Sequence, residues 1–294
     1  MIRHLLQLIW NQRKQNAWLW AELLLVSVFL WFLVDYLYVM GRTYTAPLGF
    51  DIRHTYSIVI SSLSERSPDY IPKEKRERPD GVHLLTALDR IRTYPGVESA
   101  CLTDGGMPYY MGSRNLVWRI DTLQVPCRYA FVTPEFFDVF RIYDKDGKTA
   151  SLKRAIEDNN SIVISADVET MNPGLSLLGQ KAYRGNVTDE IEETIRGISV
   201  PIRRHEYTKA EPNVYRALRL SRMEEGYYEG MIDAVRLCVR VRPDVDNADF
   251  PTRFRKDMAE QLRLGNLYLL DVQPLSYIRD GYIRSIGVEN EVKT

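Results

Sequence analysis

Residues 18–38 read WLWAELLLVSVFLWFLVDYLY and form the longest apolar stretch of this 294-residue chain. As a helix, a segment of this length is about 31 Å long, which matches the roughly 30 Å hydrocarbon core of a bilayer. Tryptophans and tyrosines stand at its two ends, where amphipathic rings prefer the headgroup level. The stretch therefore predicts a transmembrane helix over residues 17–40, followed by a large, charged extramembrane region.

Two acids, Glu22 and Asp35, lie within this stretch, and an acid at a helix centre costs about 2.5–3.5 kcal/mol on insertion scales. Each lies about one turn from an end of the stretch, and Ser27 is the one polar residue between them. A core helix of a water-soluble protein usually keeps a polar face, which this segment lacks over three turns. The two acids are accounted for either by an interfacial position or by contact with a partner helix.

Flanking charges predict the orientation of the span. Arg13 and Lys14 precede it, and no acid occurs before Glu22. The positive-inside rule places the N-terminus in the cytoplasm and residues 40 onward on the other side of the membrane. An uncleaved anchor is favoured over a signal peptide, because residues 39–42 (VMGR) are a poor cleavage site. Residues 1–16 have apolar positions at helical spacing, so they form either a cytoplasmic amphipathic helix or the first turns of the anchor.

Composition excludes several classes of function. The chain has 39 basic and 39 acidic residues, so it lacks the positive charge that nucleic-acid binding needs. Its three cysteines are too few and too scattered for a disulfide framework or a zinc site. Cys101 and Cys127 either form one disulfide in an exported domain or stay free, and Cys238 has no predicted partner.

The region after the span begins with a strand–helix–strand pattern. Residues 52–60 are rich in β-branched and aromatic side chains and predict a strand. Asp80 is expected to cap a helix whose apolar residues fall on one face, and residues 97–103 predict a second strand. Residues 65–78 between the first strand and the helix alternate in charge, which is typical of a solvated loop.

The same order recurs near the end of the chain. Residues 234–241 (AVRLCVRV) alternate apolar and charged side chains, as a half-buried strand does. Asn247 or Asp249 is expected to cap a helix that ends before Gly265, and residues 267–272 predict another strand. Two such units predict an α+β fold with a split ferredoxin-like subdomain, one antiparallel sheet under two helices.

The residues between the two units predict an inserted, mostly β subdomain over residues 111–231. It is expected to hold one brief helix, which Pro134 opens. The expected strands are residues 116–120, 125–132, 161–165, 195–202 and 214–220.

No catalytic constellation is predicted, so the chain is not expected to be an enzyme, and no catalytic, cofactor-binding or metal residues are assigned. The four histidines (His4, His54, His83 and His205) are isolated and lack metal-ligand spacing. Residues 144–147 (DKDG) lack the distal ligands of a calcium loop and are expected to form a plain turn. The pairs Tyr109-Tyr110 and Tyr227-Tyr228 are either partner contacts or core residues.

Five segments together resemble MacB-type ABC transporter permeases, in particular the FtsX-like permeases of the Bacteroidetes type. They are PGVESAC (residues 95–101), VTPEFFDVF (132–140), SIVISADV (161–168), LLGQKAYRG (177–185) and LRLGNLYLLDVQP (262–274). The resemblance implies a MacB-like periplasmic core domain, with a porter-like subdomain (residues 41–110 and 232–277) interrupted by a mostly β insert of the Sabre type (residues 111–231).

The resemblance also implies a function without chemistry of its own. Such a permease subunit lies in the bacterial inner membrane and transmits ATP-driven movement to periplasmic substrates or partners, a mode called mechanotransmission. It works with a separate ABC ATPase subunit and further permease chains, in an assembly expected to be dimeric. The alternative is a stand-alone, single-pass ligand- or peptide-binding module or sensor.

The end of the sequence departs from the family pattern. Members of this family continue with three more membrane helices, whereas residues 278–294 form a charged, amphipathic tail that leads toward a missing membrane helix. Either the chain is a truncated permease, or it is a complete single-pass protein that works beside other permease chains.

Overall fold

The computed structural model describes Trp10 and residues 17–112, 114–184 and 190–292, with side chains as far as Gly287. The chain divides into two units. Unit 1 is Met1–Ala46 with Glu206–Lys209, and unit 2 is Pro47–His205 with Ala210–Thr294. Apart from Trp10, the predicted amphipathic segment of residues 1–16 lies outside the described residues, so that prediction is not tested.

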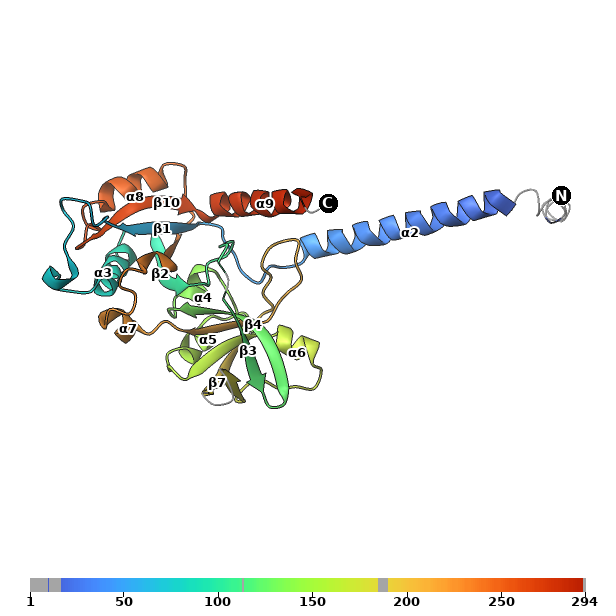
Figure 1. Ribbon diagram of the computed structural model, residues 1–294, viewed down its shortest axis with the longest axis horizontal. Helices are drawn as coiled ribbons and strands as arrows, with labels where there is room; N and C mark the ends of the chain where they lie inside the picture. The colour runs from blue at the N-terminus through green and yellow to red at the C-terminus, as the bar shows by residue number, and fades with distance from the viewer. Residues whose placement is uncertain (1–9, 11–16, 113, 185–189, 293–294) are drawn as a thin grey trace. The chain divides into compact units, whose positions relative to one another are not determined.

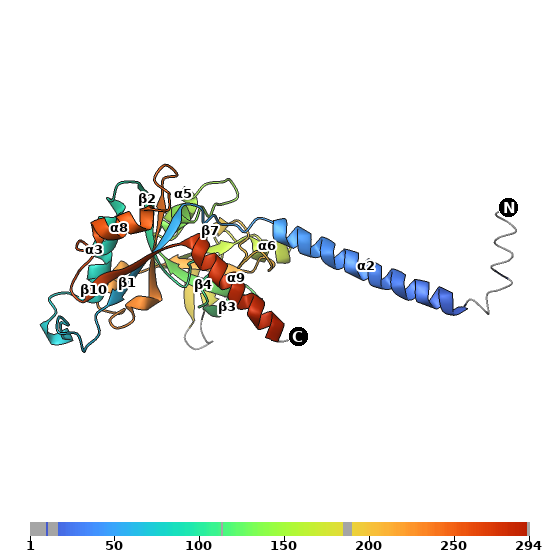
Figure 2. The same ribbon diagram turned by 90° about the horizontal axis from the view of Figure 1, so that it is seen from above.

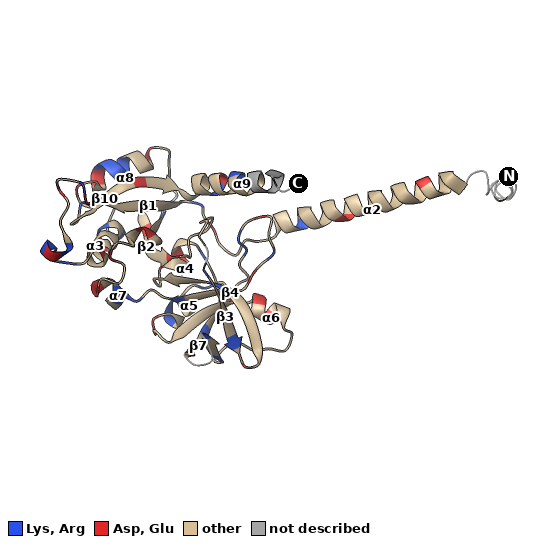
Figure 3. Ribbon diagram, in the orientation of Figure 1, with Lys and Arg blue, Asp and Glu red and all other residues tan. Residues whose placement is uncertain are grey.

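Unit 1 is dominated by one long helix, α2 (Ala17–Thr45), which confirms the helix predicted over residues 17–40. None of its residues is buried, and among the described residues it is the one helix long and apolar enough to cross a membrane. It continues one turn past the predicted end, and the Thr45 hydroxyl donates to the Gly41 carbonyl at 3.0 Å there. Figure 3 shows its few charged positions well separated along the helix.

Unit 2 contains a four-stranded antiparallel sheet built from two strand–helix–strand units (Figures 1 and 2). Its strands run in the order β10-β1-β9-β2, and each neighbouring pair is antiparallel. The first unit is β1 (Thr55–Ser62), α3 (Asp80–Arg92) and β2 (Val97–Asp104). The second unit is β9 (Val235–Val241), α8 (Phe250–Met258) and β10 (Leu267–Pro274). The predicted α+β class is confirmed.

Both helices cover one face of this sheet, because alternate strand residues point to the same side. On β1 these residues are Tyr56, Ile58 and Ile60, which pack in one core cluster with the apolar faces of α3 and α8. The helical side chains in that cluster include Leu84 and Phe254, both almost fully buried. The opposite face of β2 and β9 belongs to a second cluster, which contains Phe136 and Phe137 of the short helix α4 (Phe136–Val139).

The remaining strands close into a six-stranded ring. They are β3 (Asn115–Ile120), β4 (Leu123–Val132), β5 (Ser161–Ser165), β6 (Lys181–Arg184), β7 (Ile191–Ser199) and β8 (Asn213–Ala217). The pairing order is β4-β3-β6-β7-β5-β8, and a parallel β4–β8 pairing returns to the start. We call this ring the barrel. Its interior is filled by a third cluster around Trp118, Ile162 and Val214, as expected for a small barrel that side chains can fill.

The barrel joins the four-stranded sheet through β2 and β4, which pair at Thr103↔Val132 and Asp104↔Phe131. Short helices connect the strands, and a longer helix ends the described chain. They are α5 (Ala150–Ala155), α6 (Asp167–Met171), α7 (Leu220–Glu224), α9 (Leu275–Val292) and the 3-10 turns Lys73–Lys75 and Ile232–Ala234. The domain bounds expected from the sequence stay predictions.

Several local expectations are wrong, among them the following four. The first strand starts at Thr55 and not at residue 52, because the preceding residue, His54, has a positive φ of 57°. Asp80 is the first residue of α3 and makes no cap hydrogen bond; its carboxylate pairs with Arg76 at 3.1 Å. That buried pair, joined by Glu229, also means that residues 65–78 are not wholly solvated. Fourthly, β9 is buried on both faces, and its Arg240 is fully buried.

Candidate functional site: the entry segment and Arg240

Residues 47–54 lead the chain into unit 2, and we call them the entry segment. Its backbone is fixed by hydrogen bonds to three different parts of the domain. The Leu48 carbonyl accepts from the Arg203 amide at 3.0 Å, and the Asp51 amide donates to the Phe140 carbonyl at 2.8 Å. The His54 carbonyl accepts from the Val241 amide at 2.9 Å. The segment is therefore an integral part of the fold although it contains no regular secondary structure.

Gly49 shows how closely the entry segment approaches the domain. Its φ is +85°, and a Cβ atom at this position would lie 2.1 Å from the Pro201 carbonyl oxygen. Glycine is the residue that adopts this φ without strain and leaves room for the neighbouring backbone. Any larger residue would push the entry segment away from the loop that holds Pro201.

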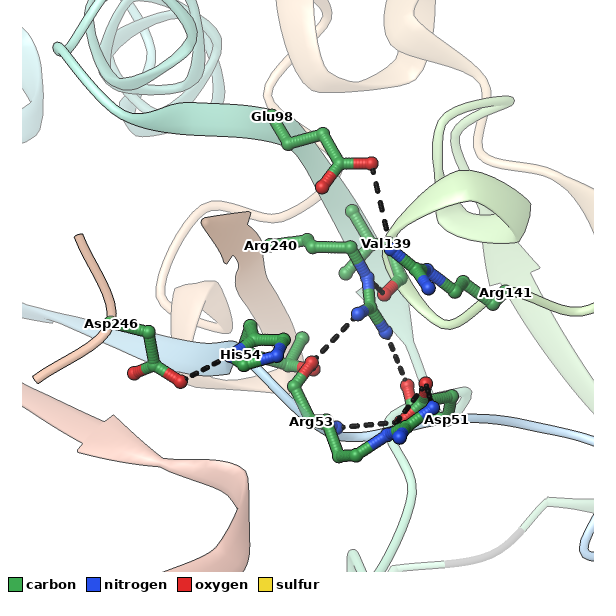
Figure 4. A network of polar contacts seen from close by, with 9 residues as sticks. Asp51, Arg53, His54, Glu98, Val139, Arg141, Arg240 and Asp246 are labelled. Atoms are coloured by element: carbon green, nitrogen blue, oxygen red, sulfur yellow. Dashed lines mark hydrogen bonds and ion pairs between the residues drawn. The ribbon is translucent and has the colours of Figure 1, made fainter. Parts of the chain in front are cut away.

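Arg240 of β9 holds the segment through its guanidinium group (Figure 4). Its guanidinium donates to the carbonyls of Asp51 at 2.6 Å, Arg53 at 2.7 Å and Val139 at 2.7 Å. The side chain is fully buried, and its bond to Val139 is buried with it, whereas the bonds to Asp51 and Arg53 are partly buried. Burial lowers the pKa of this guanidinium, while the charge of Asp51 opposes that shift. One side chain thus joins the entry segment, the sheet and helix α4; we call this group the Arg240 clamp.

An ion pair and a histidine–carboxylate hydrogen bond flank the clamp. The Arg53 guanidinium binds the Asp51 carboxylate at 2.9 Å, and His54 Nδ1 lies 2.5 Å from Asp246 Oδ2 (Figure 4). Burial raises the pKa of Asp51, but hydrogen bonds from Arg53 and the charge of Arg240 lower it by more, so it lies below its usual value. Asp246 also accepts a hydrogen bond from the Tyr56 hydroxyl, which ties the loop after β9 to the start of β1.

The exit from the domain packs on the same cluster as the entry segment. Leu275, the first residue of α9, is fully buried in the second core cluster, against which Phe50 and Ile52 also pack. A row of aromatic rings extends this contact. The ring centroids of Phe50 and Tyr109 are 5.8 Å apart, and those of Tyr109 and Tyr282 of α9 are 5.9 Å apart. Consequently, the entry segment and the start of α9 share one apolar core, and the strands that they adjoin, β1 and β10, pair at Tyr56 and Pro274.

The histidines predicted to be isolated lie apart from one another. His54 is in the clamp region, His83 is on α3, and His205 stacks near Tyr282 with 5.8 Å between ring centroids; His4 lies outside the described residues. Across the described ranges, no group of three His, Cys, Asp or Glu side chains is placed to hold a metal. Residues 144–147 form a turn, in which the Asp144 carboxylate accepts from the amides of residues 146 and 148.

The possible Cys101–Cys127 disulfide is absent, and all three cysteines are free and buried. The two side chains belong to different core clusters, since Cys101 lies between the sheet and α4 whereas Cys127 faces the barrel interior. The residue opposite Cys101 is Cys238, in the β2–β9 register. Burial raises the pKa of Cys101 well above its usual value and that of Cys127 to about 12, so both remain protonated thiols at neutral pH.

The tyrosine pairs divide between core and surface. Tyr109 and Tyr228 are buried, whereas Tyr227 is 53% exposed. Sequence analysis did not single out Arg240 or the entry segment. The one available signal was an arginine in the middle of a strongly apolar strand pattern.

Comparisons with known proteins find similarity in structure alone. No protein-family model matches the chain, and no curated protein does. A domain of a predicted permease protein from Porphyromonas gingivalis matches with a TM-score of 0.50 and 19% identity, over 78% of this chain and 92% of that one.

Two further structures match at a TM-score of 0.42. The periplasmic region of MacB from Actinobacillus actinomycetemcomitans does so with 11% identity, over 84% of this chain and 98% of that one. The extracellular domain of the noncanonic ABC-type transporter YknZ from Gram-positive bacteria matches with 12% identity, over 73% of this chain and 100% of that one. The first match shows that the chain is similar in fold to a permease domain, which confirms at the level of fold the resemblance seen in its sequence motifs.

Proposed function

We propose that this chain is the extracytoplasmic core of a MacB-like ABC transporter permease subunit. In this proposal α2 anchors the chain in the inner membrane with its N-terminus in the cytoplasm, and unit 2 lies in the periplasm. A separate ABC ATPase and further permease chains, in a dimeric assembly, supply the driving movement. The subunit then acts on substrates or partners by binding and moving.

The observation that carries the proposal is the Arg240 clamp together with the shared core of the entry segment and α9. A domain that receives movement from a membrane helix needs a stiff connection to it, because a loose linker would absorb the displacement. Hydrogen bonds to a charged group contribute about 1.5–3 kcal/mol each, and Arg240 makes three to the entry segment and α4. Movement of the entry segment is therefore passed to β9 before the segment can detach.

The chain topology supports the finer assignment. We infer that the sheet β10-β1-β9-β2 with α3 and α8 is the split, ferredoxin-like porter subdomain. The barrel, inserted in the sequence between β2 and β9, is then the Sabre-like part. Fold alone does not determine function, so this assignment depends on the tests below.

The first test is co-purification from native membranes. The full chain carrying an affinity tag is isolated in mild detergent, and the eluate is assayed for ATP hydrolysis and for a protein with ABC ATPase motifs. We expect both to be present with the wild-type chain. If purification at full yield brings neither an ATPase nor a second permease chain, the proposal is wrong and a stand-alone binding module is favoured.

The second test concerns orientation. Because the three native cysteines are buried, a new exposed thiol is a specific target for a membrane-impermeant maleimide. A cysteine replacing the exposed residue Glu74 should be labelled when only the periplasm is accessible. A matched Gln12→Cys variant, in the predicted cytoplasmic segment, should be labelled only after lysis. The opposite pattern would refute the orientation.

A further inference from the structure

One end of the barrel interior is charged, although the rest of it is apolar. Residues that face each other across neighbouring strands share a side of the sheet. Arg184 lies opposite Trp118, and Arg216 lies opposite Ile162, so both arginines point to the side of the barrel that holds the apolar cluster. Glu193 is on that side as well, and its carboxylate accepts from the indole N–H of Trp118 at 3.2 Å. We call this end the barrel mouth.

A small cavity lies at the barrel mouth, with the segment around α7 as its other wall. It encloses about 120 Å3 and is lined by five arginines together with Phe131, Ile191, Tyr227 and Tyr228. The arginines come from three parts of the chain: Arg114, Arg184, and the segment that holds Arg216, Arg219 and Arg222. The mouth of a barrel is a common place for a ligand site, and the charged residues that line this cavity are all arginines.

Two buried carboxylates neutralise only part of this charge. Glu193 binds Arg216 at 2.5 Å and lies 3.3 Å from Arg184 Nε. Asp104, at the end of β2, binds Arg114 at 2.9 Å. Counted over the described residues, five guanidinium groups against two carboxylates leave an excess of three positive charges around the cavity.

The excess charge belongs to arginines with free donors. Arg219 and Arg222 have no carboxylate within ion-pair distance among the residues that the structure describes. Arg184 Nε is buried and makes no hydrogen bond, because its geometry toward Glu193 is unsuitable. Burial lowers the pKa of Arg216, Glu193 raises it, and the neighbouring charges of Arg184 and Arg219 lower it further. A buried donor without an acceptor is costly, so the orphaned Arg184 Nε indicates a site suited to an acceptor that the described residues do not supply.

We propose that the barrel mouth binds a phosphate group. Planar guanidinium groups match phosphate oxygens in paired hydrogen bonds, and the excess of positive charge suits a doubly charged anion better than a carboxylate. The cavity has room for about four waters at roughly 30 Å3 each, which fits one tetrahedral oxyanion and not a drug-sized molecule. The group is either inorganic phosphate or the phosphomonoester of a larger molecule such as a lipid. This inference does not depend on the transport role proposed above.

The test is calorimetric titration of the full chain in a non-ionic detergent, at a fixed ionic strength of about 0.15 M to screen long-range charge. The probes are inorganic phosphate, short-chain phosphatidic acid and, as a singly charged anion, acetate. The variants are Arg219→Gln and Arg222→Gln, which break no ion pair within the described residues. Arg66→Gln, at an exposed position in the loop after β1, removes the same charge elsewhere and is the control.

We expect phosphate to bind the wild-type chain and the Arg66→Gln control equally, and acetate to bind at least tenfold more weakly. Each barrel-mouth variant should bind phosphate about tenfold more weakly, the loss of one charged hydrogen bond. Binding of phosphatidic acid alone would identify the source as a lipid headgroup, and binding of both probes would identify the phosphate group itself. Equal weakening in the control, equal affinity for acetate, or no binding of either phosphate probe would overturn the proposal. Circular dichroism of each variant checks that it is folded.

Discussion

Replacing Arg240 by methionine tests whether the clamp holds the entry segment in place. Methionine fills a similar volume with an apolar chain, and it leaves the carbonyls of Asp51, Arg53 and Val139 without their donor. Hydrogen bonds to a charged group contribute about 1.5–3 kcal/mol each, so the gross loss of three such bonds is about 4.5–9 kcal/mol. Removing the buried guanidinium also removes the cost of its desolvation, which offsets part of this loss, so we expect a net destabilisation of about 3 kcal/mol.

The assay is urea unfolding of the full chain in detergent, combined with hydrogen–deuterium exchange read by mass spectrometry. With a slope of about 3 kcal/mol per M urea, a loss of this size lowers the midpoint by about 1 M. Exchange in the peptide that covers residues 47–54 should accelerate more than exchange in β1, because the Asp51 amide loses its fixed place beside Phe140.

The matched control is Arg53→Met, because the Arg53 side chain is 78% exposed and pairs with Asp51 at the surface. It should leave both the midpoint and the exchange of residues 47–54 nearly unchanged. Arg240→Lys should recover part of the loss, since an ammonium can reach fewer than three of the carbonyls. If Arg240→Met leaves the midpoint unchanged, or loosens every segment equally, the argument that Arg240 specifically holds the entry segment fails.

Three further predictions concern the same domain. The pKa of Asp51 is depressed in the folded state, so its contribution to stability is complete above about pH 4 and is lost as the pH falls through the lower, folded pKa. Hydrogen exchange of residues 47–54 should rise selectively over that pH range. An Asp51→Asn variant should not show this rise. Phe136→Ala removes a fully buried ring whose centroid lies 4.9 Å from that of Phe140. It should lower the free energy of unfolding, measured by urea titration, by about 3–5 kcal/mol. A loss below about 1 kcal/mol would show that the second core cluster is loosely packed. Gly81→Ala should lower the free energy of unfolding, because the added Cβ would lie 2.4 Å from the Met223 carbonyl oxygen. Gly281→Ala on α9 has open space around the new Cβ and should raise the helicity measured by circular dichroism. If the two variants had equal effects on stability, the contact between α3 and α7 would be contradicted.

The sequence predicts those parts of the fold that local patterns encode. The apolar run of α2, the alternating strand β4 and the amphipathic helix α3 all appear where expected, within a few residues. The closed barrel was not predictable in this way, because its closure depends on the pairing of Tyr129 with Val214, which are far apart in the chain. Nothing in either strand's own pattern specifies that partner.

The clamp and the barrel mouth escaped prediction for related reasons. Alternation in β9 suggested one solvent-facing side, but the entry segment and α4 cover that side and bury Arg240. The arginines of the barrel mouth come from three separate parts of the chain, around residues 114, 184 and 216–222, so no single linear motif contains all of them. Both sites exist only when tertiary structure brings scattered residues together.

The pairing of the first and last strands of the sheet has a mechanical consequence. Tyr56, at the start of β1, lies opposite Pro274, at the end of β10, so a force that separates the two ends of the domain pulls on one end of an antiparallel ladder. Loaded in this direction, the ladder would unzip one rung at a time, whereas a force along the strands would have to break many rungs together. Arg240 and the aromatic row from Phe50 to Tyr282 lie beyond the first rung and would bear that load before the ladder does. The mechanical strength of this domain against opening is therefore set by a few side chains beside the start of β1 and the end of β10, and not by the number of strands in the sheet.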